Sequence, residues 1–171
     1  WQSVVLAAIV VMSINTAGPA IASGPSSSLD GAKWIWHKGA GTAAGTWYFQ
    51  KGFAFPAGLR PKAAHAVITC DNEWTLHVNG ERAGQNDPAP DSWRRPQSVD
   101  VTKLLVIERN AISIEGVNTV PGPCGLIVKV VVEFEEQKTY ELVSDGSWIS
   151  TSRPEKSWRD NGFVAGAGWT P

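Results

Sequence analysis

The chain has 171 residues, a formal net charge of -1 and 18% charged residues, which is enough sequence for one domain with short additional segments. Because nucleic-acid binding requires a basic surface, the near-neutral charge argues against a nucleic-acid partner. Glycine (17 residues) and proline (11 residues) separate short apolar runs, and tryptophan (9 residues) is unusually frequent. This composition favours an all-β fold with many turns.

The first 31 residues are expected to lie outside the fold. An apolar run over Val4–Ile14 is too short to span a bilayer comfortably, and it is followed by the cleavage pattern Ala20-Ile21-Ala22. We therefore predict a signal peptide over residues 1–22, without its basic start, and a Gly/Pro/Ser linker over residues 23–31. A buried helix or a membrane anchor is the alternative. Cleavage would leave a secreted or periplasmic protein with no stable membrane insertion.

Residues 32–171 are predicted to form one antiparallel β-sandwich. Short apolar segments with strand periodicity are separated by turn residues, and no stretch between them has the pattern of an amphipathic helix. Because a sheet must bury one face against a second layer, two packed sheets are the expected architecture. In chain order, the predicted strands cover residues 33–37, 47–55, 63–70, 73–78, 81–84, 98–101, 111–117, 126–134, 139–143 and 148–151, with a helical turn over 102–105.

The clearest local signal is a strand followed by a tight turn. Trp74, Leu76 and Val78 alternate with polar residues, the pattern of a strand with one buried face. The following Asn79-Gly80 tolerates positive φ at both central positions of a hairpin turn. His77 belongs to the less buried face of this strand, so we expect it to be solvated.

The tryptophans divide into core residues and loop residues. Those within predicted strands are expected in the core: Trp34, Trp47, Trp74 and Trp148. Trp158 and Trp169 are expected to pin the C-terminal tail to a sheet.

An ordered set of motifs runs along the chain: Ala32–Trp36, Tyr48–Phe53, Cys70-Asp71-Asn72, Val78-Asn79-Gly80, Val99–Thr102, Asn110–Glu115, Gly125-Leu126-Ile127 and Asp145–Trp148. This set resembles the galactose-binding-like jelly-roll modules on the N-terminal side of bacterial α-L-rhamnosidases and related secreted glycosidases. The resemblance implies a jelly roll whose parent enzyme keeps catalysis in a separate domain. One departure is Ile107-Glu108-Arg109 before Asn110, where the family has Pro-Gly, so that turn is expected to be reshaped.

No catalytic set is apparent in the sequence. Glycoside hydrolysis needs two carboxylates that flank one bond, and strand alternation does not by itself aim Asp71 and Glu73 at one ligand. A nucleophile elbow of the G-x-S-x-G type is also missing from the sequence. We therefore expect that this chain alone is not an enzyme, with a small glycosidase or esterase as the rival interpretation.

Sugar binding fits the sequence better than catalysis. Sugar sites combine aromatic rings, which stack on C–H faces, with polar groups that bind hydroxyls. Asp71 and Asn72 could instead brace the loop before the hairpin, and Trp93 could cap the sandwich edge. The candidate ligand-binding residues are Trp93, Arg94, Asp91, Trp36 and Asn72.

A structural calcium ion and a disulfide are the other possibilities. Modules with this topology often hold Ca²⁺, and Asp71 and Asp87 are oxygen donors of the right kind, although no dense acidic run is present. No other cofactor is expected. In an exported protein Cys70 and Cys124 could pair, or both could remain buried free thiols.

The sequence thus predicts a non-catalytic carbohydrate-binding or accessory module of a larger secreted glycoside hydrolase, similar to an α-L-rhamnosidase. Its expected partners are a glycan, the catalytic domain of the same polypeptide, or both. A purely structural interdomain module without a ligand is one alternative. An accessory domain of an exported redox or haem protein is another.

Overall fold

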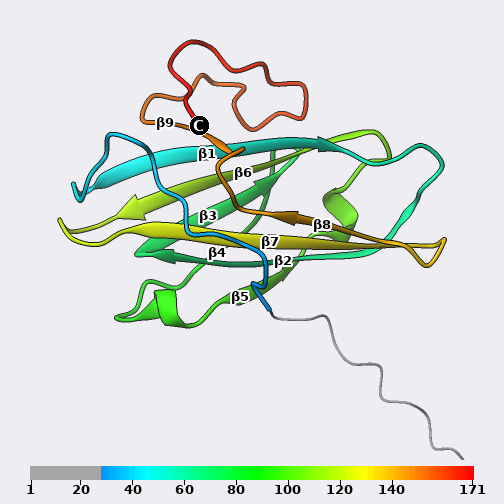
Figure 1. Ribbon diagram of the computed structural model, residues 1–171, viewed down its shortest axis with the longest axis horizontal. Helices are drawn as coiled ribbons and strands as arrows, with labels where there is room; N and C mark the ends of the chain where they lie inside the picture. Colours follow the sequence, from blue (N-terminus) through cyan, green and yellow to red (C-terminus); the bar gives the residue numbers. More distant parts are fainter. Residues whose placement is uncertain (1–27) are drawn as a thin grey trace, which may run out of the picture.

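The computed structural model describes residues 28–171, which form a two-layer β-sandwich of nine strands and two 3-10 turns (Figure 1). Among residues 28–171, no helix has the length and apolar character that crossing a membrane requires. The predicted signal peptide, and the linker up to residue 27, lie outside the described residues. The predicted all-β sandwich is confirmed.

The first sheet has five antiparallel strands in the order β4-β3-β6-β1-β9. Its longest pairing joins β1 to β6 over ten residue pairs, from Gly45 opposite Asn118 to Ala54 opposite Arg109. The strands are β1 (Gly45–Ala54), β3 (Glu73–Val78), β4 (Glu81–Gln85), β6 (Arg109–Asn118) and β9 (Ile149–Thr151).

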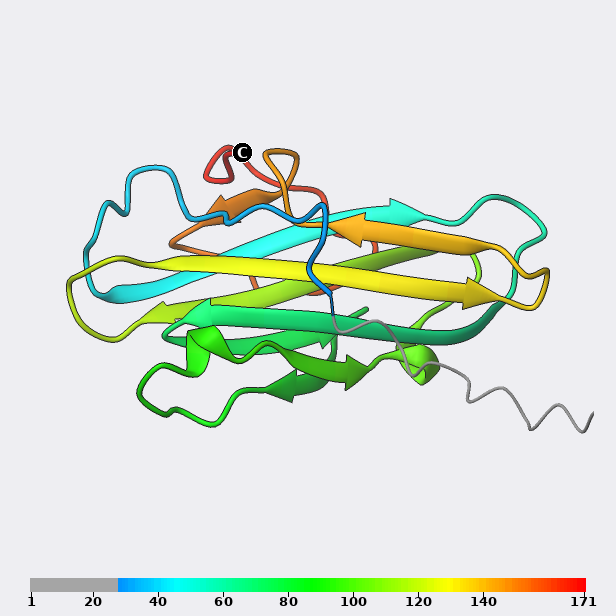
Figure 2. The same cartoon turned by 60° about the horizontal axis from the view of Figure 1, so that its bottom comes forward.

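The second sheet has four antiparallel strands in the order β5-β2-β7-β8, and it faces the first sheet (Figure 2). Most predicted strands are confirmed, but the one predicted over 33–37 is wrong. That segment makes a single bridge, from Ile35 to Leu126. The elements are β2 (Pro61–Asp71), β5 (Gln97–Asp100), β7 (Gly125–Phe134) and β8 (Thr139–Val143), with the 3-10 turns η1 (Ser92–Arg94) and η2 (Thr102–Leu104).

The hydrophobic core lies between the two sheets and comes from alternate residues of each strand. Burying each large apolar side chain contributes about 1.5–3 kcal/mol. This packing fixes which face of every strand points inward. Fully buried members of the core include Phe49, Ile68, Leu76, Ile112, Ile114, Leu126, Val128, Val130 and Val132.

The predicted hairpin turn is confirmed. Asn79 and Gly80 have φ values of 52° and 89°, which an Asn-Gly pair adopts readily. The Asn79 amide group donates to the main-chain oxygen of Leu104 and to Oδ1 of Asn110, each at 2.8 Å. Its Oδ1 accepts from the main-chain N–H of Ala111 at 2.8 Å. The turn residue therefore ties the hairpin to the segment where the sequence departs from the family pattern.

The C-terminal segment, residues 152–171, lies over the outer face of the five-stranded sheet (Figure 1). Trp158 is 2% exposed, and its ring meets Tyr48 edge-on with 5.2 Å between centroids. The main-chain oxygen of Trp158 accepts from Gln50 Nε2 at 2.7 Å. Trp169 is 8% exposed and packs beside Trp158. The expectation that these tryptophans pin the tail is confirmed.

The same tail makes the prediction for His77 wrong. His77 is buried, because Trp158 covers it with 6.4 Å between ring centroids. Its Nδ1 has no hydrogen-bond partner among residues 28–171. Burial lowers the pKa of His77 below its usual value, and the positive charges of Arg159 and Arg82 lower it further, while Glu115 acts in the opposite direction.

This burial predicts a pH-dependent stability. The unfolded chain, with an ordinary His77 pKa of 6.5, binds more protons than the folded chain, so the free energy of unfolding should fall as pH drops through that value. The fall should stop below the folded-state pKa. We expect the free energy of unfolding of His77→Gln, measured with urea, to fall less than that of the parent between about pH 7.5 and about pH 5.5. An equal decline in both proteins would show that His77 does not cause it.

Candidate functional site

Three loops meet at one end of the sandwich, where β2 ends and β7 begins (Figure 2). Asn72 joins them. Its main-chain oxygen accepts from Asn86 Nδ2 at 3.0 Å and from Ser92 Oγ at 3.2 Å. Its side-chain Oδ1 accepts from the main-chain N–H and the hydroxyl of Thr119, at 2.8 and 2.9 Å. These hydrogen bonds support bracing, one of the two roles that the sequence left open for Asn72, and a ligand-binding role for this residue stays a prediction.

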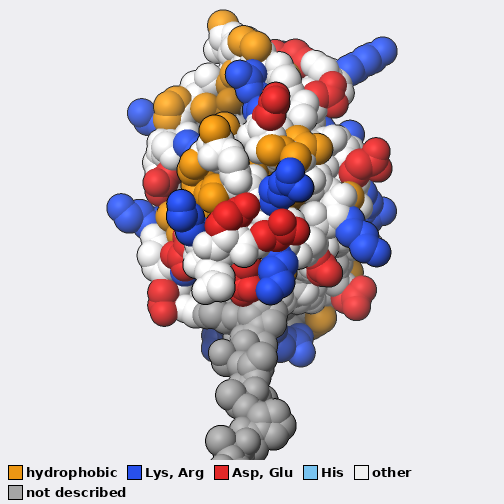
Figure 3. Space-filling view, turned by 90° about the vertical axis from the view of Figure 1, so that its right-hand side faces the viewer, with side chains coloured by type: hydrophobic (Ala, Val, Ile, Leu, Met, Phe, Trp, Pro, Cys, Tyr) orange, Lys and Arg blue, Asp and Glu red, His pale blue; other side chains and the backbone are white. Residues whose placement is uncertain are grey.

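The opposite end of the sandwich presents charged side chains of both signs together with some hydrophobic ones (Figure 3). Figure 3 looks at that end, where the turns between β1 and β2 and between β7 and β8 lie. Basic and acidic side chains are interspersed there, as on an ordinary solvated surface (Figure 3).

A hollow of about 360 Å³ opens between the joined loops. Trp93 is half-buried on one wall, and its main-chain oxygen accepts from Thr69 Oγ1 of β2 at 3.0 Å. This hydrogen bond anchors the Trp93 backbone and leaves the indole ring unused. The lining residues are Trp34, Asp71, Trp93, Pro123, Cys124 and Gly125.

Trp34 forms the other aromatic wall, so its predicted core position is wrong. It is 51% exposed. The single bridge at Ile35 leaves Trp34 outside the sandwich, and its ring lies against Gly125. A Cβ atom at residue 125 would lie only 2.8 Å from Trp34 Cε3. The sequence gives no signal that couples residues 34 and 125, because their contact depends on tertiary pairing.

Asp71 provides a carboxylate to the hollow. It lies opposite Gly125 in the β2–β7 register, and its Oδ1 accepts from Asn72 Nδ2 at 2.8 Å. Burial raises the pKa of Asp71, and the nearby carboxylate of Asp91 raises it further. The second oxygen of this partly desolvated carboxylate has no partner among the described side chains, so it can accept a hydrogen bond from a ligand hydroxyl.

The remaining predicted ligand residues separate into two places. Arg94 and Asp91 are exposed beside the hollow, and the Arg94 guanidinium lies 4.7 Å from the Trp93 ring centroid. The Arg94 Nε and Asp91 Oδ1 are 3.8 Å apart, a surface pair of little energetic weight. Trp36 does not join them. It packs on Trp47 and Phe49, with centroids 5.2 and 5.4 Å apart.

Among residues 28–171, the predicted calcium ligands are not joined by a cluster of acidic side chains. Calcium takes about six to eight oxygen ligands. Both oxygens of Asn72 already accept protein hydrogen bonds. Residues 28–171 contain no group of three or more His, Cys, Asp or Glu side chains that could hold a metal. Calcium binding through Asp71 and the exposed Asp87 therefore stays a prediction.

Of the two states left open for the cysteines, the structure has free thiols. Cys70 points into the core at 1% exposure, whereas Cys124 lines the surface hollow and its thiol donates to the main-chain oxygen of Gly41 at 3.4 Å. Burial raises the pKa of both thiols, and the carboxylate of Asp71 raises them further. A raised pKa makes a thiol a poorer nucleophile.

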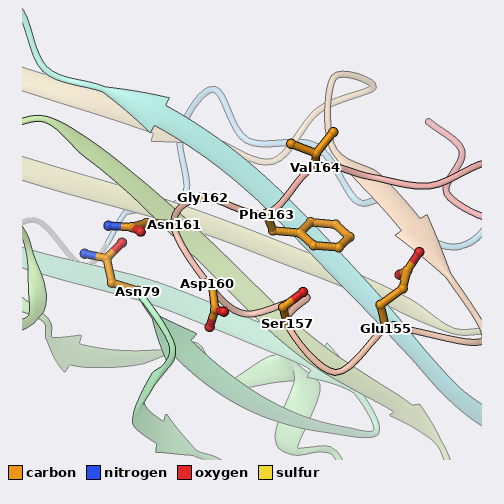
Figure 4. A pocket seen from close by; sticks show the side chains of 8 residues that line it. All are labelled: Asn79, Glu155, Ser157, Asp160, Asn161, Gly162, Phe163 and Val164. Carbon is orange, nitrogen blue, oxygen red and sulfur yellow. The ribbon is translucent and has the colours of Figure 1, made fainter.

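The C-terminal segment lines a separate, broader hollow of about 710 Å³ (Figure 4). Asn79 and Asn161 lie at one end of it, Glu155 lies at the other, and Phe163 is between them (Figure 4). The Glu155 carboxylate accepts from Trp169 Nε1 at 2.7 Å, and Asn161 Nδ2 donates to the main-chain oxygen of Arg109 at 3.2 Å. No tryptophan is among its lining residues, so it is the weaker candidate.

Comparison with protein-family models and with curated protein sequences gives no match. Solved structures do match. Part of the Streptomyces avermitilis α-L-rhamnosidase, complexed with L-rhamnose, has a TM-score of 0.73 and 27% identity over 83% of this chain and 14% of the rhamnosidase. The Pleurotus ostreatus lectin in complex with GalNAc has a TM-score of 0.72 and 26% identity over 83% of this chain and 42% of the lectin.

A third match, the α-L-rhamnosidase from Dictyoglumus thermophilum, has a TM-score of 0.69 and 24% identity over 82% of this chain and 20% of that protein. This chain spans less than half the length of each of the three proteins. It is a galactose-binding-like β-sandwich module that resembles domains of α-L-rhamnosidases.

The bracing role of Asn72 can be tested by substitution. Asn72→Ala removes the acceptor for both Thr119 donors, and we expect it to lower the free energy of unfolding by about 1–2 kcal/mol in urea titrations. Asp87→Ala, an exposed change in a neighbouring loop, is the matched control and should stay within about 0.5 kcal/mol of the parent. Equal effects of the two substitutions would contradict the bracing role.

Proposed function

We propose that this chain is a non-catalytic carbohydrate-binding module whose sugar site is the hollow between Trp34 and Trp93. The observation that carries this proposal is the convergence of two tryptophans and one partly desolvated carboxylate on a single hollow. The flat indoles offer stacking surfaces for the C–H faces of a pyranose. The Asp71 carboxylate accepts a hydrogen bond from a sugar hydroxyl. The hydrogen-bonded loops preorganise the site before the ligand binds.

A single shallow site of this kind binds weakly. A dissociation constant between about 1 mM and about 1 μM, or about 4–8 kcal/mol, is the appropriate range. Weak individual sites are useful in modular proteins because a linked catalytic domain adds effective concentration.

Hydrolysis is not part of the proposal. Both retaining and inverting glycosidases place two carboxyl groups about 5–9.5 Å apart across the bond that breaks. Among the residues that line the hollow, Asp71 is the single carboxylate. The hollow thus offers sugar contacts without a second acid or base.

We further propose that the module is part of a larger secreted glycoside hydrolase of the α-L-rhamnosidase type. The matched rhamnosidases support this, since the matched region is a small fraction of each of those enzymes. The predicted signal peptide over residues 1–22 supports export. The glycan and a catalytic domain of the same polypeptide are then the partners.

A structural interdomain module without a ligand is the rival. The exposed ring of Trp34 is compatible with this structural role, because such a ring can pack against a neighbouring domain as well as against a sugar. The two roles differ in whether the purified chain binds glycan by itself.

The binding role is tested with Trp93→Ala. Loss of one stacking surface should weaken glycan binding by about tenfold or more. The thermal midpoint should barely change, because Trp93 is anchored through its main-chain oxygen. The measurement is a glycan-array screen with rhamnose- and galactose-containing glycans, with and without calcium, followed by calorimetric titration of the best binder.

Arg95→Ala is the control for Trp93→Ala, since Arg95 is an exposed neighbour that does not line the hollow. It should bind as the parent does. A folded protein that ignores every glycan, together with a large fall in the midpoint for Trp93→Ala, would favour the structural role.

A further inference from the structure

A second hollow, of about 270 Å³, lies on the other side of Trp34. Trp34 is half-exposed and is among the lining residues of both hollows, so the two hollows adjoin at this residue. Trp36, which does not join Trp93, lines this second hollow instead. Lys33, Asp145 and Ser150 contribute polar groups to it.

Backbone pairing holds the polar rim of the second hollow in place. The main-chain N–H of Lys33 donates to the main-chain oxygen of Ser144 at 2.8 Å, and the Ser144 hydroxyl donates back to the oxygen of Lys33 at 2.7 Å. The backbones of Lys33 and of Asp145, which follows Ser144, are therefore held next to each other. A rim that is ordered before binding reduces the entropy cost of binding.

The rim offers both an acceptor and donors for sugar hydroxyls. Asp145 Oδ1 accepts from the hydroxyl and the main-chain N–H of Ser147, and these hydrogen bonds lower the pKa of Asp145. Its carboxylate therefore stays ionised, with the other oxygen unclaimed by side chains of residues 28–171. Lys33, which also lines the hollow, carries an ammonium group that can donate.

We propose that the two hollows form one site for an oligosaccharide of at least two sugar units, with Trp34 beneath the linkage. This inference rests on the proposed sugar-binding function and extends it from a single sugar to a chain. One unit occupies the hollow of Trp93 and Asp71, and the next occupies the hollow of Lys33 and Asp145.

The sizes of the hollows support a chain over a single sugar. Ligand pockets usually have volumes of about 300–1,000 Å³, and the hollows of 360 and 270 Å³ are each near the lower limit. A ligand that crosses Trp34 uses the stacking surface of one indole for two units.

The test compares methyl monosaccharides with their oligosaccharides by calorimetric titration of the purified protein. The probes are methyl L-rhamnoside, methyl galactoside, and the corresponding rhamnose and galactose trisaccharides. For the sugar that binds, we expect the trisaccharide to bind about tenfold or more tightly than the monosaccharide. Trp34→Ala should weaken trisaccharide binding by a similar factor, since Trp34 contacts both units.

Asp145→Asn distinguishes the second hollow from the first. It keeps an acceptor for Ser147 but removes the charge, and we expect it to weaken trisaccharide binding about fivefold while leaving monosaccharide binding unchanged. Asp160→Asn, in the separate hollow of Figure 4, is the matched control and should change neither. Thermal midpoints confirm that each variant is folded.

The outcomes separate this inference from the function on which it rests. Equal affinity for mono- and trisaccharide, or an Asp145→Asn variant that weakens both alike, overturns the extended site and leaves the sugar-binding function standing. Absence of binding to all four probes and to the wider array overturns both.

Discussion

The pairing of β2 with β7 is the constraint on which the candidate site depends. Its register places Asp71 opposite Gly125, directly beside the pair formed by Cys70 and Leu126. Leu126 also bridges to Ile35, and this bridge lays the Trp34 ring against Gly125. A slip of one residue would turn Asp71 into the core and Cys70 toward the surface, so burial of the core fixes the register and with it the site.

The C-terminal segment covers a polar face of the five-stranded sheet that would otherwise be solvated. Gln50 and Ser113 point outward from the five-stranded sheet, yet both are buried. Each donates to the main-chain oxygen of Trp158. These bonds give partners to the two buried side chains and to the main-chain oxygen of the tail, as buried polar groups require. The ion pair between Arg159 and Glu115 also joins the C-terminal segment to β6.

The region under the C-terminal tail and the region around Trp34 therefore differ in how many polar groups remain available to a ligand. Under the tail, Gln50 and Ser113 donate to the main-chain oxygen of Trp158, and burial lowers the pKa of His77. Around Trp34, aromatic surface and unclaimed polar atoms of Asp71 and Asp145 remain open to a ligand. Exposed aromatic surface beside unpaired polar groups is the physical signature of a binding site.

The sequence by itself determined the all-β architecture and the Asn79-Gly80 hairpin, because turn chemistry and strand periodicity are local properties. It also selected Trp93 as a surface aromatic residue. Only the tertiary structure decided that Trp34 is exposed and that His77 is buried. Those outcomes depend on which segment covers which face, and contacts between residues such as 34 and 125 leave no trace in local patterns.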